Sequence, residues 1–249
     1  MKEIILKVDK LSKNYHTKDK EIEAIKDLSM DVYQNEILAI VGPSGCGKST
    51  LLSILANLEE KSSGSIYIKD NNKIGYMLQT DSLFPWLKVL DNSLIGLSIN
   101  NNKKEKNIRK VINLLDKYGL SDFKNSFPSN LSGGMKQRVA LIRTLATNPS
   151  LILLDEPFSA LDYQTRLALS NDMYKIIKNE KKTAILITHD IAEAISMADR
   201  VIVLTKRPCH VKNIYEINLN NKSNPINNRQ DKLFNYYYEM IWRDLDVHI

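Results

Sequence analysis

The sequence contains no apolar run long enough to cross a lipid bilayer. Its longest runs, Ile37 to Val41 and Leu151 to Leu154, are far shorter than the roughly 20 residues that a membrane-spanning helix needs. The first residues also lack the apolar region of a secretory signal, since Lys2 and Glu3 directly follow Met1. The sequence therefore predicts a protein that does not span a membrane, is not exported and stays in the cytoplasm.

The sequence is also poor in cysteine and shows no repeating architecture. Its two cysteines, Cys46 and Cys209, cannot form a disulfide framework or a metal cluster, and intracellular thiols are normally reduced, so we predict no redox role for them. No internal repeat or heptad run is present. With 43% hydrophobic and 26% charged residues, the composition predicts a globular protein that buries a sizeable core without covalent staples.

The excess of positive charge is modest. A net charge of +6 is compatible with nucleic acid or anionic lipid as a partner, but it is small for 249 residues. One basic segment contains apolar residues at helical spacing, namely Ile108, Val111, Ile112, Leu115 and Tyr118. We interpret its charges as the solvated face of an ordinary helix, and we predict no nucleic-acid partner.

Strand-like and helical segments alternate along the chain. Strand-like runs lie at Ile4 to Val8, Ile37 to Val41, Ser65 to Lys69, Ile74 to Leu78, Leu151 to Leu154, Thr183 to Thr188 and Val201 to Thr205. Helical periodicity covers about residues 82–147, then Thr165 to Lys178 and Ile191 to Ala198. Buried strands that alternate with helices predict an α/β core with a parallel sheet and a helical insertion.

The tail from Lys206 onward is predicted to begin as an Asn-rich linker and to end in a helix. The apolar and aromatic residues that would share one face of this helix are Phe234, Tyr237, Tyr238, Ile241 and Leu245.

A loop with the pattern of a phosphate-binding site follows the run ILAIV. The sequence GPSGCGKST matches G-x-x-x-x-G-K-[ST], with a strand before it and the helical LLSILANL after it. Glycines let the backbone turn its N–H groups toward a phosphate, and the helix N-terminus adds a favourable dipole. We predict that Lys48 pairs with the β- and γ-phosphates and that Ser49 ligates Mg²⁺. The predicted binding residues are Gly42, Pro43, Ser44, Gly45, Cys46, Gly47, Lys48, Ser49 and Thr50.

Two acids end the apolar strand in LILLDEP, residues 151–157. A buried carboxylate without a partner is costly, and Mg²⁺ is the natural partner beside a phosphate-binding loop. Asp155 is predicted to hold the metal through its water shell, and Glu156 to orient or deprotonate the attacking water. The alternative is that the two acids cap the next helix.

Polar groups suited to phosphate chemistry follow four of the predicted strands. They are the Gly42 loop, Gln79, the pair Asp155 and Glu156, and His189. In open α/β sheets, ligands bind at the carboxyl ends of the strands, so these groups are expected to converge. The convergence predicts hydrolysis of a nucleoside triphosphate, with Gln79 and His189 near the γ-phosphate or the attacking water.

The segment LSGGMKQR, residues 131–138, supplies a second anion-binding helix start at Ser132, Gly133 and Gly134. Together with the phosphate loop, LLDEP, SALD and THD, in this order and spacing, it resembles the ATP-binding cassette (ABC) ATPases. The resemblance covers nearly the whole chain to about Leu219. It implies an α/β fold of the P-loop NTPase class and the ABC ATPase type, with an antiparallel β subdomain and a helical subdomain insertion.

The resemblance also implies roles for individual residues. Tyr15 matches the aromatic that stacks on adenine, and Asp162 matches the acid that links two subunits. Ser132, Gly133 and Gly134 of one copy would close on the ATP that a second copy holds, in a head-to-tail dimer. The implied catalytic residues are Glu156, His189 and Gln79, the last in the loop that leads into the helical subdomain. The implied metal ligands are Ser49, Gln79 and Asp155.

The predicted domain organisation follows the same resemblance. An ABC ATPase domain is expected at residues 1–219, with the helical subdomain inserted at about residues 82–147. A linker and helical tail are expected at residues 220–249. Asn57 stands where a glycine commonly ends the first helix of the family, and asparagine also tolerates the left-handed conformation required there.

Residues 77–97, 155–166 and 188–208 resemble the ATP-binding subunits of bacterial importers for nitrate, sulfonates, taurine and pyrimidine precursors of thiamine. This resemblance implies a subunit on the cytoplasmic face of the membrane that hydrolyses ATP to drive two permease subunits. It also implies an extracytoplasmic solute-binding protein as an indirect partner. The alternative is a soluble ABC ATPase acting on nucleic acid, ribosomes or iron-sulfur assembly. The chain lacks the inserted coiled coil or fused second cassette of such proteins, and it lacks the N-K-x-D motif of a P-loop GTPase.

The segment from Thr80 to Leu97 is predicted to dock on the permease. It contains Phe84, Pro85 and Trp86 in succession. Large aromatics supply much of the binding energy in protein interfaces. The alternative is that Phe84 and Trp86 pack into their own helical subdomain.

Overall fold

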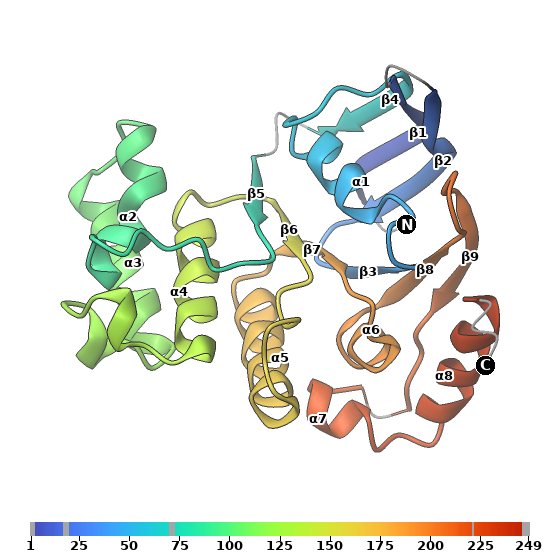
Figure 1. Ribbon diagram of the computed structural model, residues 1–249. Coiled ribbons are helices and arrows are strands. Elements are labelled where there is room, and N and C mark those ends of the chain that lie inside the picture. The colour runs from blue at the N-terminus through green and yellow to red at the C-terminus, as the bar shows by residue number, and fades with distance from the viewer. Residues whose placement is uncertain (1–2, 17–19, 70–72, 221, 246–249) are drawn as a thin grey trace.

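The computed structural model describes residues 3–16, 20–69, 73–220 and 222–245. It has two sheets and a group of helices at one end (Figure 1). The three-stranded sheet comprises β1 (Ile4–His16), β2 (Glu21–Tyr33) and β4 (Ser63–Ile68). The six-stranded sheet comprises β3 (Ile37–Val41), β5 (Ile74–Met77), β6 (Leu151–Asp155), β7 (Thr183–Ile187), β8 (Arg200–Leu204) and β9 (Val211–Glu216).

Eight α-helices and two short 3-10 helices accompany the sheets in the described part of the chain. The α-helices are α1 (Lys48–Leu55), α2 (Val89–Ile99), α3 (Glu105–Lys117), α4 (Gly133–Ala146), α5 (Tyr163–Asn179), α6 (Ile191–Met197), α7 (Pro225–Asn228) and α8 (Phe234–Asp244). The 3-10 helices are Ser121–Phe123 and Pro128–Asn130. No helix among the described residues is both long and apolar enough to span a membrane.

The larger sheet is parallel except at one edge, as the alternation of strands and helices predicts. Its strand order is β5-β6-β7-β3-β8-β9, and only β9 runs antiparallel to its neighbour. The carboxyl ends of β3, β5, β6 and β7 therefore lie along one edge of the sheet. The predicted phosphate loop, Gln79, the two acids and His189 all follow these ends.

Alternate residues of the buried strands enter two different cores. Leu38 and Ile40 of β3 pack in the core that contains α1 and the three-stranded sheet, so α1 lies between the two sheets (Figure 1). Ile37 and Ala39 pack in the core formed with α4, α5 and α6 on the opposite face. Both faces of the central strands are thus covered, which explains their continuous apolar sequences.

The helical insertion forms where the periodicity predicts it. Helices α2, α3 and α4 lie between β5 and β6 in sequence and pack against one another through Leu94, Leu97, Val111, Leu115, Val139 and Ile142. This group extends away from the two sheets (Figure 1). Helix α4 also contacts α5 and β5, so the insertion is attached to the core through α4.

Two strands are missing from the sequence-based assignment. β2 was not predicted, because its burial is irregular and it pairs with β1 through several register shifts. The stretch after Lys206, predicted as a linker, instead contains β9, a mostly exposed edge strand with polar residues. Edge strands bury little apolar surface, so they leave a weak pattern in the sequence.

The predicted C-terminal helix is present as α8 and packs against the core. Phe234 and Ile241 are buried, and Tyr237, Tyr238 and Leu245 pack on the same cluster. Helix α8 contacts α6, which places the chain's last described element beside the main sheet's helical layer. Residues 246–249 of the predicted tail lie outside the described residues.

Asn57 ends α1 in the conformation that its sequence position predicts. Its φ is +58°, in the left-handed region. The N–H of Asn57 donates to the carbonyl of Ile54, and the N–H of Leu58 donates to the carbonyl of Ser53. These two bonds form a Schellman motif, which needs glycine or asparagine at this position.

Replacing Asn57 tests this cap. Asn57→Ala should lower the free energy of unfolding by about 1 kcal/mol, because alanine pays a steric cost in the left-handed region. Asn57→Gly, the matched control, should stay within a few tenths of a kcal/mol of the wild type. Urea unfolding measures both variants, and equal stability of the alanine variant would contradict the assignment.

Candidate functional site

The phosphate loop connects β3 to α1 and requires glycine at two positions. Gly45 has φ +69° and Gly47 has φ +130°, values that side chains with a Cβ rarely adopt. A Cβ on Gly47 would also lie 3.1 Å from the Cys209 Sγ and 3.2 Å from the carbonyl oxygen of Ala24. The loop is therefore closely packed against the turn that carries Cys209 and against β2.

The Lys48 ammonium is held inside this loop. Lys48 is buried, and its Nζ donates to the carbonyl oxygens of Gly42 at 2.8 Å and Pro43 at 2.9 Å. A buried cation is stable only with such partners. These carbonyls keep the charge at the start of α1, where the helix dipole also favours an anion.

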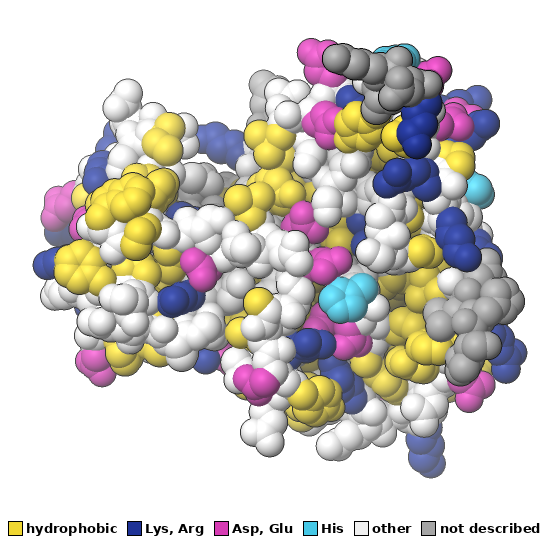
Figure 2. Space-filling view, viewed as in Figure 1, with side chains coloured by type: hydrophobic (Ala, Val, Ile, Leu, Met, Phe, Trp, Pro, Cys, Tyr) yellow, Lys and Arg dark blue, Asp and Glu magenta, His cyan; other side chains and the backbone are white. Residues whose placement is uncertain are grey.

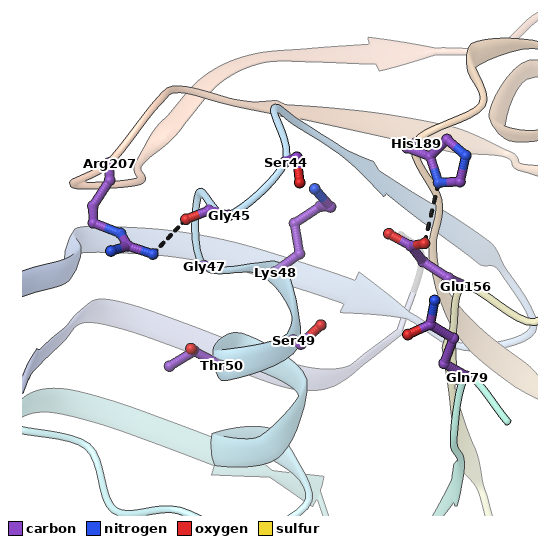
Figure 3. Close-up of a pocket in the computed structure, with 10 residues that line it drawn as sticks. All are labelled: Ser44, Gly45, Gly47, Lys48, Ser49, Thr50, Gln79, Glu156, His189 and Arg207. Atoms are coloured by element: carbon purple, nitrogen blue, oxygen red, sulfur yellow. Dashed lines mark hydrogen bonds and ion pairs between the residues drawn. The ribbon is translucent and has the colours of Figure 1, made fainter. Parts of the chain in front are cut away.

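The loop forms one wall of a pocket of about 640 Å³. Lys48, Ser49, Gln79, Glu156 and His189, which the sequence predicts to act together, line this one pocket (Figure 3). The remaining lining residues are Ser44, Gly45, Gly47, Thr50 and Arg207. The volume is that of an ordinary ligand site. Polar and charged side chains from four strand exits thus meet in a space large enough for a nucleotide.

Asp155 does not line the pocket itself but lies next to the lining residue Ser49, between two hydroxyl groups. The Ser49 hydroxyl donates to its Oδ1 at 3.4 Å, and the Tyr76 hydroxyl donates to its Oδ2 at 3.1 Å. Burial raises the pKa of Asp155, while the bonds from Tyr76 and Ser49 oppose the shift. Burial and the neighbouring Asp155 carboxylate raise the pKa of Tyr76 to about 12. The Tyr76 hydroxyl therefore stays protonated at neutral pH and acts as the hydrogen-bond donor to Asp155. Tyr76 was not predicted as a site residue.

Glu156 and His189 contact each other on the side of the pocket that faces the phosphate loop (Figure 3). The Glu156 Oε2 lies 3.1 Å from the His189 Nδ1 (Figure 3). The Glu156 backbone is in the left-handed region with φ +43°, and its N–H donates to the carbonyl of Ile187. A non-glycine residue in this region is strained, and such strain is concentrated at functional sites. The backbone geometry therefore supports a special role for Glu156.

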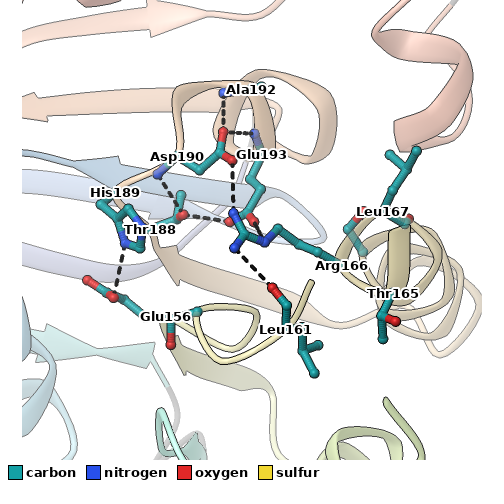
Figure 4. A network of polar contacts seen from close by, with 12 residues as sticks. Glu156, Leu161, Thr165, Arg166, Leu167, Thr188, His189, Asp190, Ala192 and Glu193 are labelled. Carbon is teal, nitrogen blue, oxygen red and sulfur yellow. Dashed lines mark hydrogen bonds and ion pairs between the residues drawn. The ribbon is translucent and has the colours of Figure 1, made fainter. Parts of the chain in front are cut away.

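A network of polar contacts fixes the loop that carries His189 (Figure 4). The Thr188 hydroxyl donates to the buried Glu193 at 2.6 Å, and the N–H of Asp190 donates back to the Thr188 hydroxyl at 3.0 Å. Burial raises the pKa of Glu193. Arg166 on α5 approaches both Asp190, at 3.5 Å, and Glu193, at 3.7 Å.

Arg166 also reaches the segment that contains Asp162. Its Nη2 donates to the carbonyl oxygen of Leu161 at 3.1 Å (Figure 4). Asp162 caps α5 by accepting from the N–H of Thr165 at 3.0 Å, and hydrogen bonds with Thr165 lower its pKa. One side chain thus connects the His189 loop with the loop before α5. Arg166 carries no motif of its own, and the sequence did not identify it.

Gln79 is exposed at the exit of β5. Its Nε2 donates to the Ser159 hydroxyl at 3.1 Å, and this bond connects the Gln79 side chain to the loop after β6. Farther on, Arg143 of α4 donates to the carbonyl oxygens of Asp81 and Ser82 at 2.7 Å each. The segment after Gln79 is thus bonded to the helix that begins at the LSGG sequence.

The other predicted binding residues lie outside the lining of the pocket. Tyr15 is half-buried and does not line the pocket itself, but its hydroxyl lies 3.2 Å from the hydroxyl of Thr50, which does. Ser132, Gly133 and Gly134 start α4, where the Ser132 hydroxyl accepts from the N–H of Met135. Gly42, Pro43 and Cys46 shape the loop, and the Cys46 side chain is buried.

Arg207 lines the pocket although the sequence did not single it out. It follows β8, whose carboxyl end lies next to that of β3. The rule that ligands bind at strand exits covers this position as well as the four that were used. Arg207 lies in the segment 188–208 that resembles the importer subunits, but that resemblance assigns no role to it.

Comparisons with known proteins agree on one family. A family profile described as ABC transporter matches residues 25–159. The "Uncharacterized ABC transporter ATP-binding protein YtlC" of Bacillus subtilis is 43% identical over 97% of this chain and 95% of its own length. The "Aliphatic sulfonates import ATP-binding protein SsuB" of Zymomonas mobilis is 40% identical over 83% of this chain and 84% of its own length.

A solved structure gives the same result. It is described as the dimeric structure of a post-hydrolysis state of the ATP-binding cassette MJ0796 bound to ADP and Pi. It aligns with a TM-score of 0.73 and 32% identity, covering 86% of this chain and 99% of that one. The fold class predicted from the sequence is therefore correct, and the chain belongs to the ABC transporter family as an ABC-type ATPase.

Proposed function

We propose that this chain is the ATP-hydrolysing subunit of a membrane importer for a small solute, and that the pocket beside Lys48 is its catalytic site. The observation that carries the proposal is the convergence of Lys48, Ser49, Gln79, Glu156 and His189 on one pocket. These side chains come from four strand exits, and each has a function in phosphoryl transfer to water.

ATP would bind with its phosphates in the loop at the start of α1. The loop offers backbone N–H groups and a helix N-terminus, and Lys48 adds a positive charge. In the free chain two carbonyls of the same loop hold the Lys48 ammonium, and it would exchange these partners for the β- and γ-phosphates when ATP binds.

The residues around Asp155 fit a bound Mg²⁺. Magnesium prefers oxygen ligands and is usually held by one or two carboxylates together with substrate phosphates. Ser49 and Asp155 offer a hydroxyl and a carboxylate that already lie 3.4 Å apart, and Gln79 adds an amide oxygen at the pocket wall. These three residues would hold the ion, which neutralises the charge of the β- and γ-phosphates when bound.

Glu156 would orient and deprotonate the attacking water. Its carboxylate faces the pocket, and the 3.1 Å contact with His189 fixes one of its oxygens. Tyr76 holds Asp155 in place next to Glu156, and the Thr188 network holds the backbone of the His189 loop. A general base positioned in this way contributes about 10² to 10⁴ to the rate.

The ATP-bound state is proposed to be a head-to-tail dimer. Ser132, Gly133 and Gly134 form a capped helix start outside the pocket of their own chain, so they are available to the phosphates held by a second copy. Arg166 links the loop before Asp162 to the His189 loop, which would connect the dimer contact with the catalytic residues. The dimeric state of the MJ0796 cassette supports this arrangement.

The permease is proposed to dock on the segment from Thr80 to Leu97. Trp86 is 69% exposed and Phe84 is 37% exposed, with their rings 5.4 Å apart. The alternative that Trp86 packs in the helical core is therefore wrong for the isolated chain. Figure 2 shows apolar side chains gathered on the surface over the α2 and α3 end of the molecule, to which this segment leads.

A buried asparagine holds this aromatic segment in a fixed shape. Asn92 on α2 accepts from the N–H of Phe84 at 2.8 Å and donates to the carbonyls of Phe84, Leu87 and Lys88. The exposed rings are thus presented on an ordered loop, which lowers the entropic cost of binding a partner. Arg143 and Gln79 connect the loop to α4 and to the pocket.

We propose that the subunit lies at the cytoplasmic face of the membrane, with an extracytoplasmic solute-binding protein acting indirectly through the permease. The proposed solute is a small compound such as nitrate, a sulfonate, taurine or a thiamine precursor. The similarity to a relative named for aliphatic sulfonate import supports this class.

Loss of the Lys48 charge should abolish tight nucleotide binding. Lys48→Ala removes both a cation and a hydrogen-bond donor from the phosphates, so we expect the Kd for Mg·ATP to rise at least about a hundredfold. Titration calorimetry measures it, with Lys206→Ala as the control for net charge. An unchanged Kd in the Lys48 variant would remove this residue from the site.

Glu156→Gln should separate ATP binding from hydrolysis. The amide keeps the shape of the side chain but cannot accept a proton, so turnover should fall by roughly 10² or more while the Kd for ATP is retained. The ATP-bound dimer should then accumulate in sedimentation experiments. Wild-type turnover, with monomers only at saturating ATP, would rule out the proposed role.

Trp86→Ala should impair docking without loss of stability. Because the ring is exposed, the free energy of unfolding should change by no more than about 0.5 kcal/mol, and ATP affinity should be unaffected. Truncation of a central interface aromatic costs at least about 2 kcal/mol, so capture of the permease should weaken about thirtyfold. Tyr163→Ala, at another strongly exposed aromatic, is the control. Normal permease capture by the Trp86 variant would place the interface elsewhere.

A further inference from the structure

Arg207 forms part of the pocket wall that the sequence motifs leave unassigned. It lies in the turn between β8 and β9 and lines the same pocket as Lys48. We infer that Arg207 is a second cationic contact for the phosphates of the nucleotide, on the side of the phosphate loop away from Glu156. The inference rests on the proposed function, because it assigns a further binding residue to the same site.

Hydrogen bonds link the two sides of the turn that carries Arg207. Within it, the N–H of Thr205 donates to the carbonyl of His210 at 3.1 Å, and the Thr205 hydroxyl donates to the carbonyl of Pro208 at 3.3 Å. These bonds hold the backbone of the turn, and a bond from the Arg207 guanidinium to the carbonyl oxygen of Gly45 holds the side chain. Both reduce the entropic cost of a further contact.

The same turn is hydrogen-bonded to β2, the strand that packs against the phosphate loop. The N–H of Cys209 donates to the carbonyl of Ala24, and the N–H of Lys26 donates to the carbonyl of Cys209, both at 3.0 Å. Cys209 is fully buried, and a Cβ on Gly47 would lie 3.1 Å from its sulfur. The turn and the phosphate loop are thus packed as one unit, so Arg207 keeps its place relative to the loop.

Arg207 makes one direct contact with the phosphate loop. Its Nη2 donates to the carbonyl oxygen of Gly45 at 2.6 Å (Figure 3). A guanidinium has five N–H donors in a planar fork, and this contact uses one of them. The planar, cationic fork of an arginine suits phosphate oxygens.

The position of Arg207 indicates which phosphates it meets. In Figure 3 the Lys48 side chain lies between Arg207 and the pair formed by Glu156 and His189. The γ-phosphate belongs beside Glu156, where water must attack it. Arg207 therefore faces the inner phosphates, which ATP and ADP share, and it should stabilise the bound nucleotide before and after hydrolysis.

Arg207→Gln tests the contact, with Lys206→Gln as the matched control. Lys206 is the preceding residue of the same turn, carries the same charge and does not line the pocket. We expect the Kd for both Mg·ATP and Mg·ADP to rise about tenfold in the Arg207 variant, the usual effect of one exposed charge-assisted bond. Lys206→Gln should bind both nucleotides like the wild type. Wild-type Kd values for Arg207→Gln would overturn the inference.

A conservative variant and added salt separate a phosphate contact from support of the loop. Arg207→Lys keeps the charge, so its Kd should stay within about threefold of the wild type. The defect of Arg207→Gln should shrink between 50 and 500 mM salt, because exposed charges are screened. A glutamine defect that is equal in Arg207→Lys and independent of salt would show that Arg207 only holds the Gly45 carbonyl, and it would overturn the inference. An equal loss in Lys206→Gln would do the same.

Thermal melts without nucleotide check that the variants are folded. If Arg207→Gln melts early, Arg207→Met repeats the titration with a side chain that packs more like the arginine stem. Lys48→Ala, measured alongside, distinguishes the two proposals. Lost ATP affinity in Lys48→Ala with normal affinity in Arg207→Gln removes only the Arg207 contact. Normal affinity in Lys48→Ala removes the proposed site itself.

Discussion

The burial of the central strands on both faces determines where this protein can place charge. Every residue of β3, β6, β7 and β8 is buried. A charge inside such a strand is costly unless it is paired, as Arg200 is with Glu36 at 3.1 Å at the amino end of β8. The site's polar groups therefore lie at or beyond the carboxyl ends, and parallel alignment brings these ends to one edge. The pocket is a consequence of the sheet topology.

Side chains behind the pocket convert this convergence into a fixed geometry. Tyr76 and Ser49 hold the two oxygens of Asp155, and Thr188 fixes the loop of His189 through Glu193. The contacts then continue outward in two directions. Arg166 reaches the loop before α5, and Arg143 joins the proposed docking segment, residues 80–97, to α4. A change at the phosphates can thus reach both proposed interfaces through a few bonded residues, which is what coupling of hydrolysis to movement requires.

The sequence was sufficient to predict the structure wherever the local backbone or burial requires a particular type of residue. The apolar runs of β3, β6 and β7, the glycines of the phosphate loop and the left-handed Asn57 each have one plausible structural explanation. The same holds for the residues that end the parallel strands, so the main lining of the pocket could be predicted. The sequence was insufficient for β2 and β9, whose patterns are irregular or polar, and for residues that act through tertiary contacts. Tyr76, Arg166 and Arg207 acquire their partners only from strands and turns distant in sequence.

The edge formed by these strand ends is where we propose that the phosphates of ATP bind. A crystal structure of the chain with Mg²⁺ and a non-hydrolysable ATP analogue tests it most directly. We expect density for the triphosphate along the loop from Gly42 to Thr50, with the Lys48 ammonium moved from its carbonyl partners to the phosphates and the terminal phosphate between Gln79 and His189. A nucleotide bound elsewhere, or a triphosphate that leaves Lys48 on the carbonyls of Gly42 and Pro43, would contradict it.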